Sequence, residues 1–414
     1  MKVLYLNSYF YPEDVASSYL GHNVREALVN SDINVVLYTP VPTRGVSGEL
    51  RKEYSTVKKN EAWHNGGLQI HRFWLPKERK NPLVRAFRYT LQVIKQFNRG
   101  VFAKDARSCN VLFVASTPPI QGTIASMVKK IRHIPLVYNL QDIFPDSLVG
   151  TGMTHKGSLL WKIGRKIEDF NYRNADKIIV ISQDFKKNIM AKGVPEEKIE
   201  VVYNWVDQNA TVPVKDEDNE LFEEFCISRD KFRVVYAGNL GNAQNIEIIV
   251  NTARKLKENS NIQFIIFGKG GLEEEIKAAK AKEQLDNLMI LPLQPYERVS
   301  KVYGLGHVCI VACKPGLGGA AMPSKTWSIM SSGRAVLANF DEGELKEIVE
   351  NNNCGVFTKA GDLEGFVNAI VKLSEQPERC AEMGKNGRQF ILDNLTREVG
   401  TQKYVNVIKS VVKQ

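Results

Sequence analysis

One stretch of the chain, residues 309–339, combines glycines, a serine and a lysine in a spacing that suits the binding of an anion. Its first residues, 309–312, are apolar and typical of a buried parallel strand, and a loop with three glycines follows them. Next come Pro323-Ser324-Lys325 and a short predicted helix over 326–332, which Gly333 ends. A glycine loop and a helix start gather backbone N–H groups around one point, and the lysine adds positive charge. We therefore predict that this point holds an anion such as a diphosphate.

The composition indicates a protein of two domains with acidic partners. With 414 residues, 43% of them apolar, the chain can bury a sizeable core, and two domains are favoured over one. The net charge of +10 suits a phosphorylated substrate, an anionic membrane surface or nucleic acid. No apolar run reaches the ~18 residues of a membrane-spanning helix, and Met1-Lys2 leads into a strand rather than a signal peptide. We expect a cytoplasmic protein, soluble or peripheral on the inner face of the membrane.

Several familiar sites are missing from the sequence. No Gly-x-Gly-x-x-Gly follows the first strand, which disfavours nicotinamide and flavin enzymes. No Gly-x-x-x-x-Gly-Lys-Ser/Thr occurs, which disfavours P-loop phosphotransferases. The six cysteines are scattered and indicate neither a disulfide framework nor a metal site. No DNA-binding motif accompanies the charge, so we expect no nucleic-acid partner.

Strands that alternate with helices must position these residues. In the first half we predict strands at 3–7, 34–39, 69–74, 111–115, 136–140, 177–182 and 199–203, with a polar, flexible stretch at 42–67. The alternation favours right-handed βαβ units in an α/β fold with a mostly parallel sheet. Ligands of such sheets bind beyond the carboxyl ends of strands. Ser116, Asp142 and the loop 8–18 all fall at that edge.

The second half repeats this organisation after a polar, acid-rich segment. Residues 208–230 are interpreted as a linker with a first surface helix, and strands are predicted at 232–238, 261–267 and 288–291 before the opening stretch. We expect an N-terminal domain at 1–207, joined by a C-terminal helix at 395–414, and a second domain at 208–394. Two doubly wound domains with glycine turns concentrated in the second suggest a nucleotide-containing ligand held in an interdomain cleft.

Several segments come in one order that resembles the retaining glycosyltransferases of family 4, which have the GT-B fold of two Rossmann-like domains. They are Phe10-Tyr11-Pro12-Glu13, Asn139-Leu140-Gln141-Asp142-Ile143-Phe144-Pro145-Asp146, Tyr203-Asn204-Trp205-Val206-Asp207, Ala237-Gly238-Asn239-Leu240-Gly241 and Pro323-Ser324-Lys325-Thr326-Trp327 with Gly333-Arg334-Ala335-Val336. The resemblance extends over nearly the whole chain. Within the family, the chain is most similar to the bacterial surface-polysaccharide branch that includes N-acetylfucosaminyl transferases.

The resemblance implies a nucleotide-sugar donor, with UDP as the favoured nucleotide, bound to the C-terminal domain. It also implies an undecaprenyl-diphosphate-linked saccharide as acceptor, in capsule or O-antigen assembly. Lys325 would stabilise the leaving diphosphate. The predicted donor-binding residues are Gly238, Asn239, Asn242, Lys269, Leu293, Gln294, Gly318, Gly319, Ala320, Ala321, Pro323, Ser324 and Ser328.

The sequence departs from the family pattern at two carboxylates. Many members carry two glutamates eight positions apart, and Ala320 and Ser328 stand there in this chain. A frequent His-Asp pair is replaced by Gln141-Asp142, so Asp142 joins Lys325 as a catalytic candidate. The alternative interpretation of Asp142 is an aspartate that braces its loop. The predicted acceptor-side residues are Glu13, Ala16, Ser17 and Ser116.

No nucleophile for a double displacement is evident. The family therefore implies a front-face mechanism in which the leaving phosphate helps to deprotonate the acceptor. Neither a cofactor nor a metal is expected. Two other functions stay open: a non-catalytic sugar-nucleotide-binding scaffold, which the missing glutamates favour, and a nucleotide-sugar epimerase, whose acid and histidine set is not visible.

The segment from Lys77 to Arg107 is basic and amphipathic. Apolar residues recur at helical spacing, and basic residues lie largely opposite them. The pattern predicts contact with an anionic membrane surface. The alternative is an ordinary helix that buries its apolar stripe in the fold.

Overall fold

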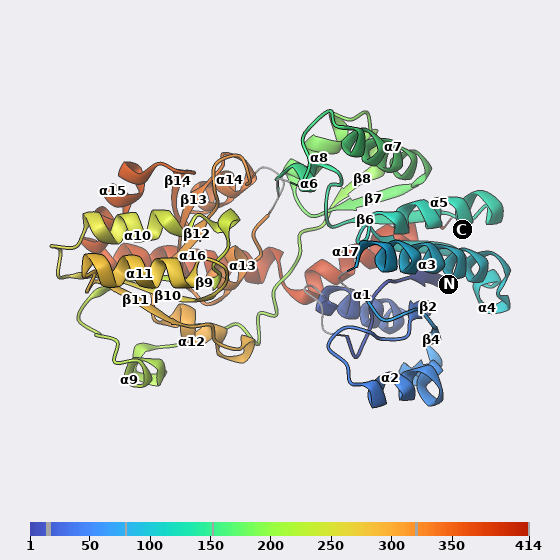
Figure 1. Cartoon of the computed structure of the whole chain (residues 1–414), viewed down its shortest axis with the longest axis horizontal. Coiled ribbons are helices and arrows are strands. Elements are labelled where there is room, and N and C mark those ends of the chain that lie inside the picture. The colour runs from blue at the N-terminus through green and yellow to red at the C-terminus, as the bar shows by residue number, and fades with distance from the viewer. Residues whose placement is uncertain (14–17, 79–80, 151–152, 319–321, 413–414) are drawn as a thin grey trace. The chain divides into compact units, whose positions relative to one another are not determined.

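The chain forms two compact units in this computed structural model, which describes residues 1–13, 18–78, 81–150, 153–318 and 322–412. The first unit comprises Met1–Tyr203 with Glu398–Gln414, and the second comprises Asn204–Arg397 (Figure 1). The division falls after Tyr203, whereas we predicted it after residue 207. Each unit is an open α/β sheet with its own buried apolar core.

The first unit is built on an eight-stranded sheet within the described residues, in the order β3-β4-β2-β1-β5-β6-β7-β8. The strands are β1 (Lys2–Leu6), β2 (Asn34–Pro40), β3 (Asn60–Trp63), β4 (Leu68–Phe73), β5 (Val111–Ala115), β6 (Leu136–Leu140), β7 (Lys177–Val180) and β8 (Ile199–Val201). The strand order reverses between β1 and β5, which pair in parallel. Ligands of doubly wound sheets bind at such a reversal.

The prediction of a flexible stretch at 42–67 is wrong. This segment contains α2 (Gly48–Ser55) and β3, which pairs antiparallel to β4. The Ser47 hydroxyl accepts a hydrogen bond from Leu50 N at 3.1 Å and so caps α2, and Tyr54 on that helix is buried. The helix is short and polar, so sequence periodicity gave little sign of it, and tertiary contacts of Tyr54 and Arg51 hold it in place.

Helices pack against the sheet and against one another in this unit. They are α1 (Ser18–Asn30), α3 (Pro82–Phe102), α4 (Lys104–Arg107), α5 (Ile120–Arg132), α6 (Asp146–Gly150), α7 (Leu159–Asn174) and α8 (Gln183–Met190). Helix α5 contacts both α3 and α7. Figure 1 shows α17 (Arg397–Ser410), in red, among the blue and green elements of the first unit. Tyr404 on α17 is buried there, and its hydroxyl donates a hydrogen bond to Asn139 Oδ1 at 3.0 Å.

The second unit has a six-stranded parallel sheet within the described residues, in the order β11-β10-β9-β12-β13-β14. The strands are β9 (Phe232–Asn239), β10 (Ile262–Lys269), β11 (Leu288–Pro292), β12 (Val308–Ala312), β13 (Ala335–Phe340) and β14 (Gly355–Lys359). The helices are α9 (Leu221–Glu224), α10 (Ile246–Lys255), α11 (Glu273–Glu283), α12 (Val299–Gly304), α13 (Lys325–Ser331), α14 (Glu344–Asn351), α15 (Leu363–Ser374) and α16 (Pro377–Asn394). The strand order reverses between β9 and β12.

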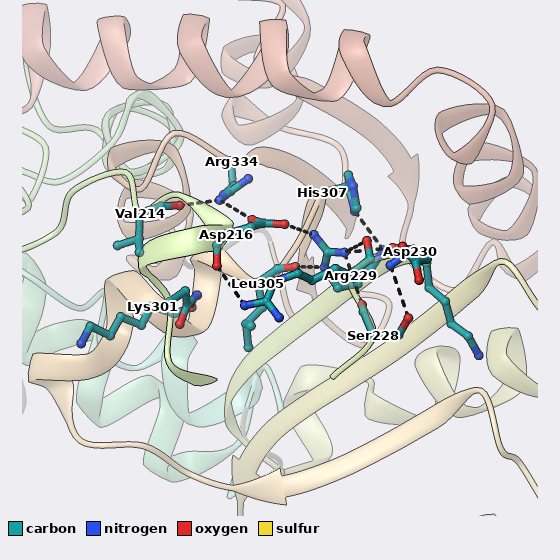
Figure 2. A network of polar contacts seen from close by, with 12 residues as sticks. Val214, Asp216, Ser228, Arg229, Asp230, Lys301, Leu305, His307 and Arg334 are labelled. Carbon is teal, nitrogen blue, oxygen red and sulfur yellow. Dashed lines mark hydrogen bonds and ion pairs between the residues drawn. The ribbon is translucent and has the colours of Figure 1, made fainter. Parts of the chain in front are cut away.

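The predicted linker is held firmly on the second unit by a polar network (Figure 2). The buried Arg233, near the start of β9, donates to Asp216 Oδ2 at 2.6 Å and to the carbonyl of Leu305. Arg334 donates to the carbonyl of Val214 at 2.8 Å. The one Asp-x-Asp spacing of the sequence, Asp216 and Asp218, lies in this linker, where Asp216 pairs with Arg233. The network lies near the amino ends of the strands, which leaves the carboxyl ends to the candidate site.

Candidate active site

Lys325 places a buried positive charge at the reversal of the second sheet. It is the first residue of α13, and its Nζ lies 4.0 Å from the ring centroid of Tyr236 on β9. Within the described part of the chain, Nζ is buried and has no hydrogen-bond partner. Burial lowers the pKa of Lys325 to about 7. A buried cation without a partner is costly, which points to an anion that completes the site.

Gly238 lets the lysine reach this position. An added Cβ at Gly238 would lie 3.0 Å from Lys325 Nζ, and the residue has φ +145°, a conformation that side chains rarely adopt. The structure therefore brings together Gly238 and Lys325, two residues that the sequence placed in separate motifs. Glycine is required here both by the backbone angle and by the close approach of the ammonium group.

The ends of β9 and β10 bring two further candidates side by side. Asn239 and Lys269 are paired residues of these parallel strands, and both are exposed. The Tyr236 hydroxyl donates to the carbonyl of Asn239 at 2.8 Å, so the tyrosine fixes the strand end as well as facing the lysine. Asn242 is exposed in the short 3₁₀ turn that follows. All three side chains are exposed at this edge.

In the glycine loop, two backbone N–H groups are hydrogen-bonded to a carboxylate of the same unit. Gly318 N donates to Asp341 Oδ2 at 2.7 Å, and Gly316 N donates to Asp341 Oδ1 at 3.0 Å. Asp341 thus takes the N–H of Gly318 in the described conformation, and the contact of Gly318 with the donor stays a prediction. Three more predicted donor-binding residues, Gly319, Ala320 and Ala321, lie outside the described residues.

The start of α13 lacks a side-chain cap. Ser324 occupies the N-cap position and is exposed, but its side chain makes no capping hydrogen bond. Pro323 lies just before it, and its carbonyl accepts from Thr326 N at 3.0 Å. Ser328 is half-buried one turn further along the helix. The Ser324 hydroxyl is therefore available to a ligand beside Lys325.

Two predicted donor-binding residues, Leu293 and Gln294, follow β11. Leu293 is exposed, which suits an apolar contact with a planar base. Gln294 is engaged within its own loop: its amide nitrogen donates to the carbonyl of Pro292 at 3.0 Å, and its amide oxygen accepts from Arg298 at 2.8 Å. Both side-chain atoms of Gln294 would have to exchange partners to contact a ligand.

In the first unit, Ser116 organises the loop that carries Asp142. The buried Ser116 Oγ accepts hydrogen bonds from Gln141 N at 3.0 Å and from Asp142 N at 3.3 Å. Gln141 Nε2 also donates to Asn139 Oδ1 at 2.9 Å. Ser116 therefore holds the loop through its oxygen, and its contact with an acceptor stays a prediction.

Asp142 itself is half-buried at the carboxyl end of β6. Burial raises the pKa of its carboxyl group, a hydrogen bond from Ser147 opposes that rise, and the nearby negative charge of Asp146 adds to it. A raised pKa makes the carboxylate a better proton acceptor. The contact with Ser147 also fits the loop-bracing alternative.

Glu13 is buried, and its two carboxylate oxygens differ in their contacts. Its Oε1 accepts from Thr43 N at 2.7 Å and from Arg44 N at 2.9 Å, while Oε2 has no hydrogen-bond partner among the described residues. One oxygen therefore shapes the fold and the other is available. The other two acceptor-side candidates, Ala16 and Ser17, lie outside the described residues.

Two residues at strand ends were not in our prediction. Tyr236 faces the lysine from within β9, and Asp341 follows β13 and holds the glycine loop. Asp341 comes directly after β13, much as Asp142 comes two residues after β6, so a search for carboxylates just beyond strands would have found it. Tyr236 sits inside an apolar run, where no sequence signal separates it from a core residue.

Two family models match the chain, and together they span both units. The model described as "Glycosyltransferase Family 4" matches residues 21–210, and the model described as "Glycosyl transferases group 1" matches residues 217–390. The chain belongs to glycosyltransferase family 4. This glycosyltransferase has the GT-B fold that the sequence predicted, and the prediction of an enzyme is confirmed.

Curated relatives and solved structures agree with this assignment. The glycosyltransferase is 23% identical to "Probable glycosyltransferase WbjE" of Pseudomonas aeruginosa, over 83% of this chain and 84% of that protein. It is 26% identical to "Putative colanic acid biosynthesis glycosyl transferase WcaI" of Escherichia coli, over 68% of this chain and 70% of that protein. The solved structure of HepE from Anabaena, in complex with UDP, superposes with a TM-score of 0.71 at 14% identity, over 99% of this chain and 100% of that one.

Helix α3 of the glycosyltransferase buries only part of its apolar stripe. Val101 is buried and Leu91 and Phe97 pack against the core, whereas Phe87 and Ile94 are exposed. In the part of the chain that the structure describes, none of the helices has the length and apolar character needed to cross a membrane.

Proposed function

We propose that this glycosyltransferase transfers a sugar from a nucleotide-sugar, with UDP as the nucleotide, and retains the configuration at the anomeric carbon. The observation that carries the proposal is the buried, unpartnered ammonium of Lys325 at the sheet reversal. Among the solved structures of the same fold, HepE binds UDP. A diphosphate is the group of a nucleotide-sugar that would satisfy such a cation.

In the reaction, the bond between the anomeric carbon and the diphosphate oxygen breaks, and a bond from the acceptor hydroxyl oxygen to the same carbon forms on the same face. Because the new bond forms on the face that the diphosphate leaves, no protein nucleophile is needed, and the leaving phosphate helps to deprotonate the acceptor hydroxyl. Lys325 stabilises the charge that develops on the diphosphate, and a fixed donor in a dry site is worth about 3 kcal/mol. Asp142 on the first unit is the carboxylate proposed to position the acceptor or receive its proton. No metal or cofactor takes part in this scheme.

The proposed substrates come from the polysaccharide branch of the family. The donor sugar is an N-acetylated deoxyhexosamine such as N-acetylfucosamine, and the acceptor is an undecaprenyl-diphosphate-linked saccharide in capsule or O-antigen assembly. The name of WcaI, which refers to colanic acid biosynthesis, supports a surface polysaccharide.

The first experiment measures thermal stabilisation by UDP, GDP, TDP and their sugars. UDP and UDP-sugars are expected to raise the melting temperature, because a ligand that binds only the native state stabilises it by about 2.7 kcal/mol at a hundredfold excess over Kd. Lys325→Ala should lose the response. Lys314→Ala is the matched control, because Lys314 follows the neighbouring strand β12 but already pairs with Glu247 at 3.5 Å. No response of the wild type to any nucleotide would contradict the proposal.

Turnover then separates an enzyme from a nucleotide-binding scaffold. Hydrolysis or transfer of a radiolabelled UDP-sugar is measured in the wild type and in Asp142→Asn, which keeps the shape of the side chain and removes its charge. We expect UDP binding to be unchanged and turnover to fall by about a hundredfold, the usual contribution of a proton-transfer group. Full turnover in Asp142→Asn would leave Asp142 with the loop-bracing role, and an absence of turnover in the wild type would favour the scaffold.

Contact with an anionic membrane is part of the same proposal. The exposed Phe87 and Ile94 on α3 lie seven residues apart, so they share one helix face. Flotation with anionic vesicles should fall when both are changed to serine. Leu392→Ser removes an exposed apolar side chain of the second unit and serves as the control. Equal flotation of all variants would contradict membrane contact through α3.

A further inference from the structure

A hollow of about 500 Å³ in the first unit is lined by three cations, Lys59, Lys95 and Arg99. It lies where the ends of β2 and β4 meet α2, the turn after it, and α3. Trp74, Ser55 and Asn98 also line it, and none of the described residues that line it is acidic. The hollow therefore combines concentrated positive charge with hydrogen-bonding groups and one aromatic ring.

Two of the cations are held in place by neutral partners. Lys95 Nζ donates to the carbonyl of Trp74 at 2.9 Å and lies 5.6 Å from the centroid of its ring. The guanidinium of Arg99 lies 5.4 Å from the ring centroid of Tyr38. These contacts fix the side chains without neutralising their charge. Burial lowers the pKa of Lys95, and the charges of Arg99 and Lys59 lower it further, so the three cations repel one another across the hollow.

Asp105, whose partner Tyr38 also contacts Arg99, is already engaged elsewhere. Asp105 accepts from the Tyr38 hydroxyl at 2.5 Å, from Ala106 N at 3.0 Å, and lies 2.7 Å from His71 Nε2. Its charge is thus shared with groups outside the hollow, and Tyr38 stands between Asp105 and Arg99. The repulsion inside the hollow is left for a ligand to relieve.

We propose that this hollow is a second anion site, which binds a phosphate group carried by a phosphorylated small molecule or by a lipid headgroup. Three cations match the charge of about −1.5 to −2 on a phosphomonoester better than the single charge of a carboxylate. Asn98 adds a neutral hydrogen-bonding group, and the half-exposed indole of Trp74 offers an apolar face to the group that carries the phosphate. The site belongs to the first unit and is independent of Lys325 in the second.

Fluorine NMR of the full chain labelled with 5-fluorotryptophan tests the site directly. The five tryptophans give five resonances, and that of Trp74 is assigned by its loss in Trp74→Phe. Titration with inorganic pyrophosphate should shift the Trp74 resonance saturably. Because Trp327 lies on α13 beside Lys325, its resonance reports donor-site binding separately. Failure of the nucleotide proposal would leave Trp327 unmoved by UDP without affecting the Trp74 result.

Charge variants then show whether the named cations bind the anion. Lys95→Gln and Arg99→Gln should each weaken the Trp74 response by about tenfold, the effect of one charge-assisted hydrogen bond. Lys104→Gln removes an exposed charge from the neighbouring α4, outside the hollow, and should leave the response unchanged. Unchanged resonances of the other tryptophans establish that each variant is folded. An equal loss of the Trp74 response in Lys104→Gln would show that the response depends only on the overall charge of the protein, which would contradict the site.

Two ligand arms identify the source of the phosphate. A response to glycerol 3-phosphate, but not to phosphatidylcholine vesicles that contain phosphatidic acid, assigns the site to a soluble phosphorylated molecule. A response to those vesicles, absent with pure phosphatidylcholine and with free glycerol 3-phosphate, assigns it to a lipid headgroup. If pyrophosphate, glycerol 3-phosphate and the vesicles all leave Trp74 unmoved, the hollow is not an anion site.

Discussion

Lys325 combines two properties that a purely structural lysine would not have. Its ammonium is buried against an aromatic ring, and no described residue offers it a hydrogen bond. Burial of an uncompensated charge costs stability, so such a residue persists where binding requires it. The buried charge of Lys325 therefore lowers the stability of the free protein and favours the binding of an anion.

The cost of this buried charge predicts that Lys325→Met stabilises the free protein. We expect the free energy of unfolding below pH 7 to rise by about 1–3 kcal/mol, because the buried charge is replaced by an apolar side chain of similar length. In the wild type, the pKa of Lys325 is about 7 in the folded state and 10.5 when unfolded. The unfolded state binds more protons between these values, so wild-type stability rises with pH in that window, and the variant should lack this rise.

Urea unfolding at about pH 6 and about pH 9 measures both effects. Lys314→Met is the control, because Lys314 is paired with Glu247 and should gain no stability. Destabilisation by Lys325→Met would mean that the lysine holds the fold together, which contradicts its assignment to a ligand.

The environment of His307 in the linker network predicts that the stability of the protein falls in acid. Burial, with the charges of Arg233 and Arg334, lowers its pKa to about 4 from 6.5. The folded state therefore keeps His307 neutral, and its Nδ1 accepts from Arg233 N at 3.0 Å. As the pH falls from 6.5 toward 4, the unfolded state takes up a proton that the folded state does not, and stability falls by about 2–3 kcal/mol.

His307→Asn should remove this part of the pH dependence, because the asparagine oxygen can replace Nδ1 as the acceptor and does not titrate. Urea unfolding across this range measures the difference. An identical pH profile for both proteins would show that His307 is not the group responsible.

At the scale of elements, the glycine turns after β9 and β10 shape the donor site. Gly238→Ala should cost about 1–3 kcal/mol of stability from backbone strain, and it should also weaken UDP binding by displacing Lys325 Nζ. Gly271→Ala is the matched control, because it lies in the turn after β10 and an added Cβ there meets nothing within 4 Å. Thermal shift with and without UDP measures both quantities. Equal behaviour of the two variants would contradict a specific role for Gly238.

The loop after β6 depends on elements far apart in the sequence. Ser116 from the end of β5 holds the backbone of Gln141 and Asp142, and Tyr404 from α17 contacts Asn139 and Gln141. The position of Asp142 is thus set jointly by a neighbouring strand and by the last helix. The sequence identified Asp142, named Ser116 only as an acceptor-side candidate, and gave no sign of Tyr404.

At the scale of the whole molecule, two units with separate sheets and cores predict two unfolding transitions. UDP should raise only the transition of the unit Asn204–Arg397, because stabilisation follows the unit that binds the ligand. Calorimetry measures the transitions, and the fluorotryptophan resonances assign them: Trp74 and Trp161 belong to the first unit, Trp205 and Trp327 to the second. An equal upward shift of both transitions with UDP would contradict donor binding by one unit alone.

The sequence alone determined the strand and helix alternation, the two sheets, the family and the residues at strand ends. The alternation, the sheets and the strand-end residues follow from local periodicity and from the rule that parallel strands deliver their carboxyl ends to one edge, whereas the family follows from the order of the motifs. Asp142 was found by the strand-end rule, Lys325 by its place at a predicted helix start after the glycine loop, and Gly238 by the resemblance. Helix α2 and strand β3 were missed because tertiary contacts of Tyr54 and Arg51 and an antiparallel pairing hold them in place, and neither the contacts nor the pairing leaves a periodic signal.

Only the tertiary structure decided how the site residues are partnered. It placed Lys325 against Tyr236 and so removed its ammonium from water, which lowers its pKa. It also gave the N–H of Gly318 to Asp341, where the sequence suggested a free donor. Burial and hydrogen-bond partners depend on chain segments that meet only after folding, so residue spacing specifies which groups are present, while packing specifies which of them remain available to a ligand.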